Sequence, residues 1–380
     1  MTLSCLPGLR SFMVLIQQAA VVVLMLLGVT AAHADKLDDN LQTAWESLWD
    51  QRGSALPISR WEQTITFSVT GHDAASHRPL IVKAVQAAAG ASGTAVVEVT
   101  VPDDTTSTAV LMFEIHKDAD LPETQPCDTR YRRNSNFALV GVTVRLTPKH
   151  AWRCTFHEVM HAWGIPGHPS GRTVLSYFPY RNDQLLPMDE LMLKTWYLPA
   201  FKSGTTPIEA LAFLSAVVAG QTDLGVPVDA AFQRAKEFNL QKIDELKALA
   251  SGKGEVPSIV RRSGRASESV MLESQSWAGF YLGLAYLNGT IVNRNFQSSM
   301  EWMTVSATKG HSPAQLVLAR ALIRGLGVEK DLVAARRWFS LAANSGNTVA
   351  QAELKALDSI AANTPFPAAD EKPSATTTAP

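Results

Sequence analysis

The sequence has little charge imbalance, few cysteines and few long hydrophobic runs, and each shortage narrows the possible classes of protein. Its 34 Lys and Arg residues nearly balance 35 Asp and Glu residues, giving a net charge of -1. This balance argues against nucleic acid or an anionic membrane as the main partner. After residue 34 no apolar stretch approaches the roughly 20 residues that span a bilayer. We therefore expect a soluble mature protein without a membrane partner.

The one long apolar run lies at the amino terminus. Arg10 supplies positive charge, Ala19 to Val29 are apolar, and Ala32-His33-Ala34 has the small-x-small pattern of a signal-peptidase site. These features predict a signal peptide over residues 1–34 and export to the periplasm or the medium. An uncleaved anchor is the alternative, because Phe12 to Val29 is nearly long enough to span a membrane.

Three cysteines are present, and Cys5 leaves with the predicted signal peptide. Cys127 and Cys154 remain as a pair in a compartment that we expect to be oxidising, so a disulfide between them is one expectation. Cys154 also lies three residues before His157, on the same helical face, where it could instead be a soft metal ligand. The sequence leaves both alternatives open.

The clearest candidate for a catalytic site is the stretch H-E-V-M-H, which begins at His157. On a helix, His157 and His161 lie on one face and can offer imidazole nitrogens to one metal ion. Glu158 then lies beside the metal, where its carboxylate can take a proton from a water molecule whose pKa zinc lowers to about 7. The pattern predicts a zinc-dependent hydrolase with Glu158 as its catalytic base.

The order of predicted elements around this stretch indicates an α+β domain over residues 61–200. An amphipathic amino-terminal helix within residues 35–60 precedes it and should pack on it. Alternating residues then predict a strand near 65–69, and a helix, three strands and the histidine helix follow, at about 76–88, 94–101, 109–115, 137–146 and 149–163. This order fits a twisted sheet backed by one helix and faced by the helix that carries the metal ligands.

Between the last two predicted strands, Lys117 to Asn136 is rich in Pro and Asp. We expect it to be a solvated surface loop. The alternative is that its arginines, Arg130, Arg132 and Arg133, bind an acidic substrate.

The histidine stretch resembles the metzincin group of zinc metallopeptidases, whose motif is H-E-x-x-H-x-x-G-x-x-H. Gly164 matches the glycine that ends the helix, where a left-handed conformation is commonly required. Downstream, Thr173-Val174-Leu175-Ser176-Tyr177 is similar to the family's turn S-x-M-x-Y beneath the metal, with Leu175 in place of the methionine. The resemblance implies peptide-bond hydrolysis with Zn²⁺ as cofactor, a protein or peptide substrate, and a catalytic role for Tyr177.

The third ligand departs from the family pattern. The motif places a histidine at 167, but the residue there is Gly167 and the histidine follows one position later. We select His168, because a turn containing glycine can absorb one extra residue. A carboxylate is the alternative, as in thermolysin-like enzymes, with Asp183, Asp189 or Glu190 as candidates.

The carboxyl-terminal part has a different organisation. Residues 201–270 indicate two helices and a solvated linker that bridge two domains, each with its own core. Over residues 271–360 a 36-residue period relates Ala278, Ala314 and Ala350, and also Trp302 and Trp338. These repeats resemble Sel-one-like repeats of the tetratricopeptide-related class. The resemblance implies an all-α solenoid that binds a protein partner, with packing against the first domain as the alternative. Residues 361–380 should be disordered.

The sequence thus predicts an exported zinc metallopeptidase with a repeat domain for protein interaction. The alternative function is a non-catalytic periplasmic solenoid adaptor whose zinc domain is structural or degenerate. Glu158 favours the enzyme, because a structural zinc site gains nothing from a general base beside its ligands.

Overall fold

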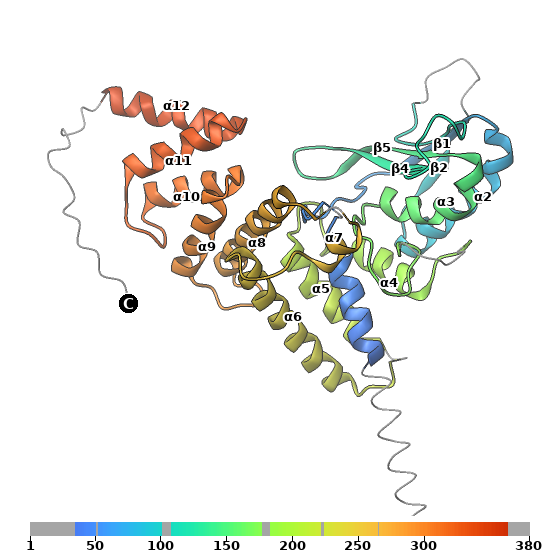
Figure 1. The fold of residues 1–380 in the computed structure, drawn as a ribbon, viewed down its shortest axis with the longest axis horizontal. Helices are drawn as coiled ribbons and strands as arrows, with labels where there is room; N and C mark the ends of the chain where they lie inside the picture. Colours follow the sequence, from blue (N-terminus) through green and yellow to red (C-terminus); the bar gives the residue numbers. More distant parts are fainter. Residues whose placement is uncertain are drawn as a thin grey trace, which may run out of the picture.

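The computed structural model describes residues 35–50, 52–100, 108–176, 183–221, 224–264 and 266–363. The predicted signal peptide, Tyr177 and the tail from residue 364 onward lie outside this part of the chain. Figure 1 shows a sheet with its helices at one end of the molecule and a stack of paired helices at the other. Within the described residues, no helix combines the length and the apolar character that crossing a membrane requires.

The sheet has five strands in the order β2-β1-β3-β5-β4. Their bounds are β1 (Ile65–Gly71), β2 (Val96–Glu98), β3 (Leu111–Ile115), β4 (Cys127–Arg133) and β5 (Leu139–Leu146). β1 pairs in parallel with β2 and β3, and β3 pairs in parallel with β5. β4 lies at one edge and runs antiparallel to β5.

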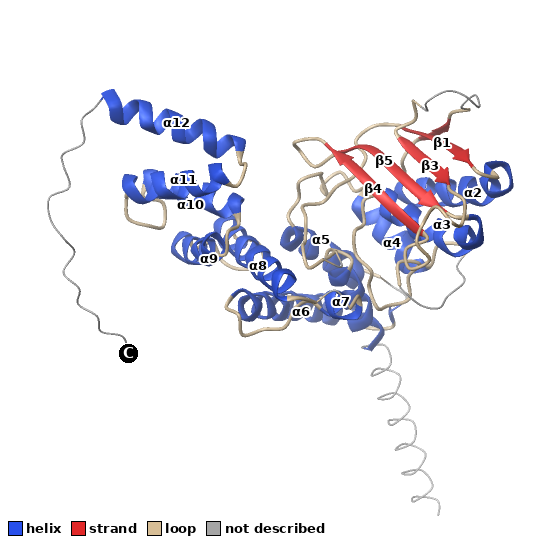
Figure 2. Ribbon diagram, turned by 45° about the horizontal axis from the view of Figure 1, so that its top comes forward, coloured by secondary structure: helices blue, strands red, loops and turns tan. Residues whose placement is uncertain are grey.

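Helices cover one face of this sheet (Figure 2). α2 (Ala74–Ser92) packs against β1 and against α3 (Pro148–Ala162), while α3 packs against β4 and β5. Alternating side chains such as Phe67, Phe113 and Val144 are fully or almost fully buried, as expected for a sheet covered on one side. The predicted strands and helices are therefore confirmed. The prediction that one helix backs the sheet while the other faces it is wrong, because α2 and α3 lie side by side on the same face.

The prediction of a loop over Lys117 to Asn136 is wrong for residues 127–133, which form β4. Cys127, Thr129, Tyr131 and Arg133 occupy alternate positions and all line the cavity described below. This is the period of two that a strand imposes. Charged residues at the intervening positions and the surrounding Pro and Asp residues obscured the pattern.

A continuous hydrophobic core joins the sheet to the helices that follow it. The helix over residues 35–46 buries Leu37, Leu41 and Trp45. Arg234 of α6 (Val228–Ala250) holds this helix through two hydrogen bonds to Asp38. The bridging helices are α4 (Pro187–Trp196), α5 (Pro207–Ala219), α6 (Val228–Ala250) and α7 (Ser258–Arg262). The same core extends into the first repeat helix. The later repeat helices bury two further clusters of their own, one that contains Met303 and one that contains Phe339.

The repeats form two helix pairs and the start of a third. Their helices are α8 (Glu268–Asn288), α9 (Phe296–Thr308), α10 (Ser312–Arg324), α11 (Leu332–Asn344) and α12 (Thr348–Asn363). Gly289 and Gly325, one period apart, both end the first helix of a pair in the left-handed conformation, with φ of 76° and 70°. The predicted period is thus reproduced in backbone geometry.

Glu46, at the end of the first helix, ties three distant segments together. Its carboxylate accepts hydrogen bonds from Arg262 and Ser258 of α7 and from the backbone N–H and hydroxyl of Ser170. Burial alone would raise its pKa, but these bonds and one from Gln42 outweigh burial and lower the pKa of Glu46 to about 2. Part of the predicted solvated linker is therefore a docked helix.

Cys127 and Cys154 form a disulfide with a Cα–Cα distance of 6.4 Å. It joins the first residue of β4 to α3 one turn before His157. Because its sulfur is bonded to Cys127, Cys154 is not a metal ligand, and this alternative is wrong.

Removing the disulfide should destabilise the protein measurably. The bond closes a loop with a sequence separation of 27 residues, for which chain entropy gives about 3 kcal/mol. We expect the Cys127→Ala/Cys154→Ala double variant to lose about that much free energy of unfolding in urea titrations. The reduced wild type should match it, and equal midpoints for oxidised wild type and variant would contradict the assignment.

The Glu46 cluster should give a defined pH dependence. Since the folded-state pKa is about 2 and the unfolded value is 4.5, its stabilisation is fully present above pH 4.5 and is lost as the pH falls through 2. Relative to Glu46→Gln, we expect the wild type to be more stable by about 2–3 kcal/mol at pH 7 and by less than half of that at pH 3. A difference between the two proteins that does not change with pH in urea titrations would disprove the linkage.

Candidate metal centre

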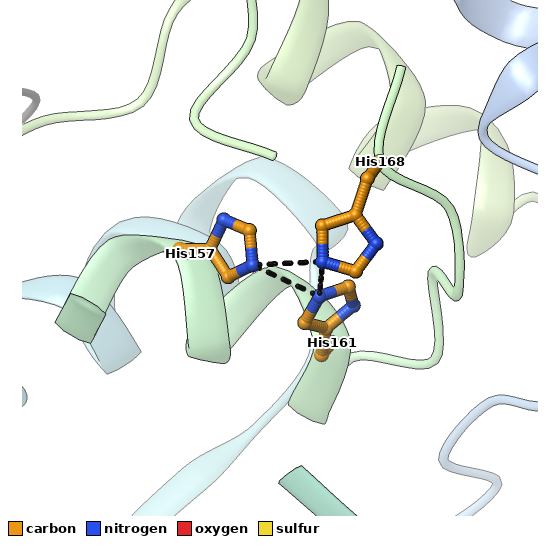
Figure 3. A group of neighbouring side chains, drawn as sticks. All are labelled: His157, His161 and His168. Carbon is orange, nitrogen blue, oxygen red and sulfur yellow. Dashed lines mark hydrogen bonds between the residues drawn. The ribbon is translucent and has the colours of Figure 1, made fainter. Parts of the chain in front are cut away.

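Three imidazole rings converge at one end of α3 (Figure 3). His157 and His161 lie one turn apart on the helix, and His168 comes from the segment that follows it. The three Nε2 atoms are 3.1 Å, 3.1 Å and 3.2 Å from one another. Among the residues that the structure describes, these histidines form a group whose geometry could hold a metal ion.

Backbone carbonyls fix the orientation of two of the rings. His157 Nδ1 donates to the carbonyl oxygen of Val174 at 2.9 Å, and His161 Nδ1 donates to that of Ile165 at 2.7 Å. Burial lowers the pKa of His157, and burial together with the neighbouring His157 lowers that of His161 to about 3. Both rings are therefore neutral with their proton on Nδ1, so each directs an Nε2 lone pair into the centre.

The lone pairs of His157 and His161 cannot hydrogen-bond to each other, since neither Nε2 carries a proton. At 3.1 Å they repel unless a cation or a donor lies between them. Around a tetrahedral zinc ion with Zn–N distances of about 2.0–2.1 Å, the ligand nitrogens are about 3.3–3.4 Å apart. The observed spacings are close to that value, so the donor set fits zinc.

The segment that leads from α3 to His168 packs closely against the backbone of other segments. Gly164 has a φ of 97°, and a Cβ atom there would overlap the carbonyl of Ser59. Gly167 lies against Glu46 and Ser47 so closely that it too has no room for a side chain, and its N–H donates to the Ser47 carbonyl at 3.0 Å. The extra residue before His168 is accommodated by this docking on the first helix.

Arg262 also holds the segment that carries His168. Its Nη2 donates to the carbonyl oxygen of His168 at 3.1 Å while the same guanidinium pairs with Glu46 at 3.0 Å. A residue of the linker, 94 positions downstream, therefore restrains the third histidine. No local pattern indicates this contact, because Glu46, the acidic partner of Arg262, is 216 positions away.

The carboxylate alternatives for the third ligand lie outside this group. Asp189 is buried and accepts hydrogen bonds from Thr173, Val174 and Leu186. Asp183 forms an ion pair with Lys83 at 3.6 Å. Asp189 instead shapes the turn whose Val174 carbonyl orients His157, and Leu175 of the same turn is fully buried.

Glu158 lies next to the histidines with a largely buried side chain. Burial raises its pKa to about 7, against the effect of a 2.6 Å hydrogen bond from Thr129 Oγ1. A carboxyl group with such a pKa can both accept and release a proton near neutral pH. Sequence analysis missed Thr129, which the alternation along β4 could have identified.

A cavity of about 810 Å³ opens over these groups. The three histidines and Glu158 form part of its wall, and β4 contributes another part through Thr129, Tyr131 and Arg133. The cavity is large enough to admit several residues of an extended chain. The predicted catalytic Tyr177 is not among the described residues, so its position relative to the cavity stays a prediction.

Comparison with known proteins identifies the repeats. Residues 278–311 and 312–347 each match the Sel1 repeat, which confirms the predicted repeat class. These residues are therefore Sel1 repeats, a class that mediates protein interaction. No curated protein matches the chain.

Two solved structures match parts of the chain. A Sel1 repeat protein from Oxalobacter formigenes has 27% sequence identity and a TM-score of 0.22, covering 33% of this chain and 97% of that one. A protective antigen present in uropathogenic Escherichia coli strains, displaying an SLR fold, has 21% identity and a TM-score of 0.22, covering 54% of this chain and 48% of that one.

Proposed function

We propose that this protein is an exported zinc-dependent peptidase that carries Sel1 repeats for contact with a protein partner. One observation carries the proposal: three imidazole Nε2 atoms converge within 3.2 Å of one another, beside a buried carboxyl group, in the wall of a large cavity. A site that only stabilised the fold would not require Glu158 in this place.

His157, His161 and His168 would hold the zinc ion. Backbone carbonyls on the far side of the first two rings keep their lone pairs directed inward, which is how proteins commonly orient histidine ligands. When bound, zinc supplies a Lewis acid and lowers the pKa of water to about 7. Three protein ligands leave a fourth position free for the reaction.

Glu158 would move the proton. In hydrolysis, water adds to the peptide carbonyl, its proton passes to Glu158, and Glu158 returns a proton to the amine that leaves when the C–N bond breaks. Thr129 keeps the carboxyl group in place through its 2.6 Å hydrogen bond. Tyr177 keeps its proposed catalytic role through the metzincin resemblance alone.

The position of β4 at the edge of the sheet indicates the class of substrate. β4 pairs on one side with β5 and forms the opposite edge of the sheet, while its residues line the cavity. An edge strand can pair with an extended peptide through main-chain hydrogen bonds. We therefore propose an extended protein or peptide segment as substrate.

Export and location belong to the same proposal. The Cys127–Cys154 disulfide is typical of proteins from oxidising compartments. It supports the periplasmic or secreted location that the signal-like residues 1–34 predict.

The second candidate is a non-catalytic adaptor with a structural metal site. The repeats favour it, since they are the part of the chain with a matched family. A peptidase depends on Glu158 for its activity and an adaptor does not. Substitution of this residue therefore distinguishes the two candidates.

Replacing Glu158 should abolish cleavage and leave the metal in place. We expect Glu158→Gln to reduce hydrolysis of a quenched-fluorescence peptide library by about 10²–10⁴-fold, the usual contribution of a general base, with unchanged zinc content. Glu190→Gln is the matched control, because this exposed carboxylate should matter neither for metal nor for cleavage. Zinc-loaded wild type that cleaves no peptide would favour the adaptor.

Arg262 should influence zinc affinity although it is not a ligand. Loss of its bond to the His168 carbonyl should weaken zinc binding by about 10-fold or more, as for other groups that orient ligands. The measurement is competition with a zinc chelator for Arg262→Ala, with His168→Ala as a stronger reference. Arg261→Ala is the control, since Arg261 pairs with Glu255 instead, and equal affinities for the two arginine variants would contradict the restraint.

A further inference from the structure

Arg133 is the last residue of β4, and its side chain lines the cavity. Its side chain is partly buried, and its guanidinium carbon lies 4.6 Å from the centre of the Tyr131 ring. Its Nε donates to the Ser59 hydroxyl at 2.7 Å. Stacking and one hydrogen bond thus hold the guanidinium in a fixed place in the cavity wall.

No carboxylate in the described part of the chain forms an ion pair with this guanidinium, although Asp50, which lines the same cavity, attracts it from a greater distance. Among residues that the structure describes, no Asp or Glu oxygen lies within 4.0 Å of an Arg133 nitrogen, and its two terminal nitrogens have no acceptor. Asp128 pairs with Arg145 instead. Asp50, an acid of the same cavity, accepts from the Arg52 N–H at 2.7 Å and the Ser54 hydroxyl at 2.8 Å.

A partly buried charge without an ion pair is costly, and a guanidinium with free donors in a cavity wall can bind a ligand that supplies an anion. Burial lowers the pKa of Arg133, Tyr131 and Asp50 oppose this effect only in part, and guanidinium remains charged in proteins. Its planar array of donors matches a carboxylate, which can accept two parallel hydrogen bonds.

The place of Arg133 along β4 relates it to Glu158. Thr129 bonds to Glu158, and Tyr131 follows two residues later, roughly 7 Å along the strand. The guanidinium lies over Tyr131. A peptide extended along β4, with its scissile bond near Glu158, would therefore bring a group within about three residues of that bond to Arg133.

We propose that Arg133 binds a carboxylate of the substrate, so that the enzyme selects peptides with an acidic group within about three residues of the cleaved bond. This inference rests on the proposed peptidase function, in which an extended peptide is the substrate. The acidic group can be an Asp or Glu side chain or the carboxyl terminus of the peptide.

Arg132 provides a matched control. It is the neighbouring residue on the same strand, with the same charge, but it points to the other face, where its guanidinium lies over Gly141 of β5. A change at Arg132 alters the net charge of the protein equally without altering the cavity.

Binding and cleavage should be measured separately. Equilibrium binding uses the zinc-loaded full chain with Glu158→Gln, which does not turn over, and peptide pools that differ only by Glu or Gln at each position. We expect at least about 10-fold tighter binding of the Glu pool, the value of one charge-assisted bond. Arg133→Gln should abolish the preference, and Arg132→Gln should preserve it. Pools with a free or amidated carboxyl terminus identify which carboxylate is bound.

Cleavage of the same pools by the chain with Glu158 intact separates this inference from the proposed function. Cleavage without any preference for Glu or a free carboxyl terminus overturns the role of Arg133 and leaves the peptidase standing. Binding with the preference, but without cleavage, supports the carboxylate site and overturns the peptidase. Equal binding of acidic and amide pools also overturns the inference, whatever the cleavage result.

Discussion

The candidate metal centre depends on the docking of residues 165–170 against the end of the first helix. Helical spacing places two of its histidines on one face of α3, but the third follows the helix and has no regular element to hold it. Backbone hydrogen bonding between Gly167 and Ser47, and the carboxylate of Glu46 beneath Ser170, supply the missing support. The first helix is therefore part of the site, and its removal would expose the segment that carries His168.

The same contact connects the centre to the repeats. Arg262 belongs to α7, which immediately precedes the first repeat helix, and it contacts both Glu46 and the His168 carbonyl. The first repeat helix in turn donates hydrogen bonds from Ser274 and Tyr281 to the backbone of residues 53–55. The core of the sheet and its helices therefore continues through the linker into the first repeat helix.

Local periodicity was enough to predict much of this structure. The spacing of His157 and His161, the alternation of β1, β3 and β5, and the repeat period each report on neighbours along the chain, and each prediction was confirmed as an element. The position of His168 also followed, because Gly164 and Gly167 allow the chain to turn there.

What escaped prediction involves partners far apart in the sequence. β4 was hidden because every second residue is charged or polar, and an edge strand can leave such residues in solvent. The run of arginines around Arg262 resembled a solvated linker, since nothing local identifies Glu46 as its partner. The disulfide was one of two expectations for Cys154, and only its geometry decides between them. The placement of α2 beside α3 likewise depends on tertiary packing, which the periodicity of the sequence does not contain.

X-ray absorption at the zinc edge of the zinc-loaded full chain tests the central claim most directly. The account predicts one zinc ion with three imidazole nitrogens at about 2.0–2.1 Å and no sulfur neighbour, and a spectrum for His168→Ala that has lost one imidazole. A sulfur neighbour at about 2.3 Å, or a spectrum unchanged by His168→Ala, would contradict it.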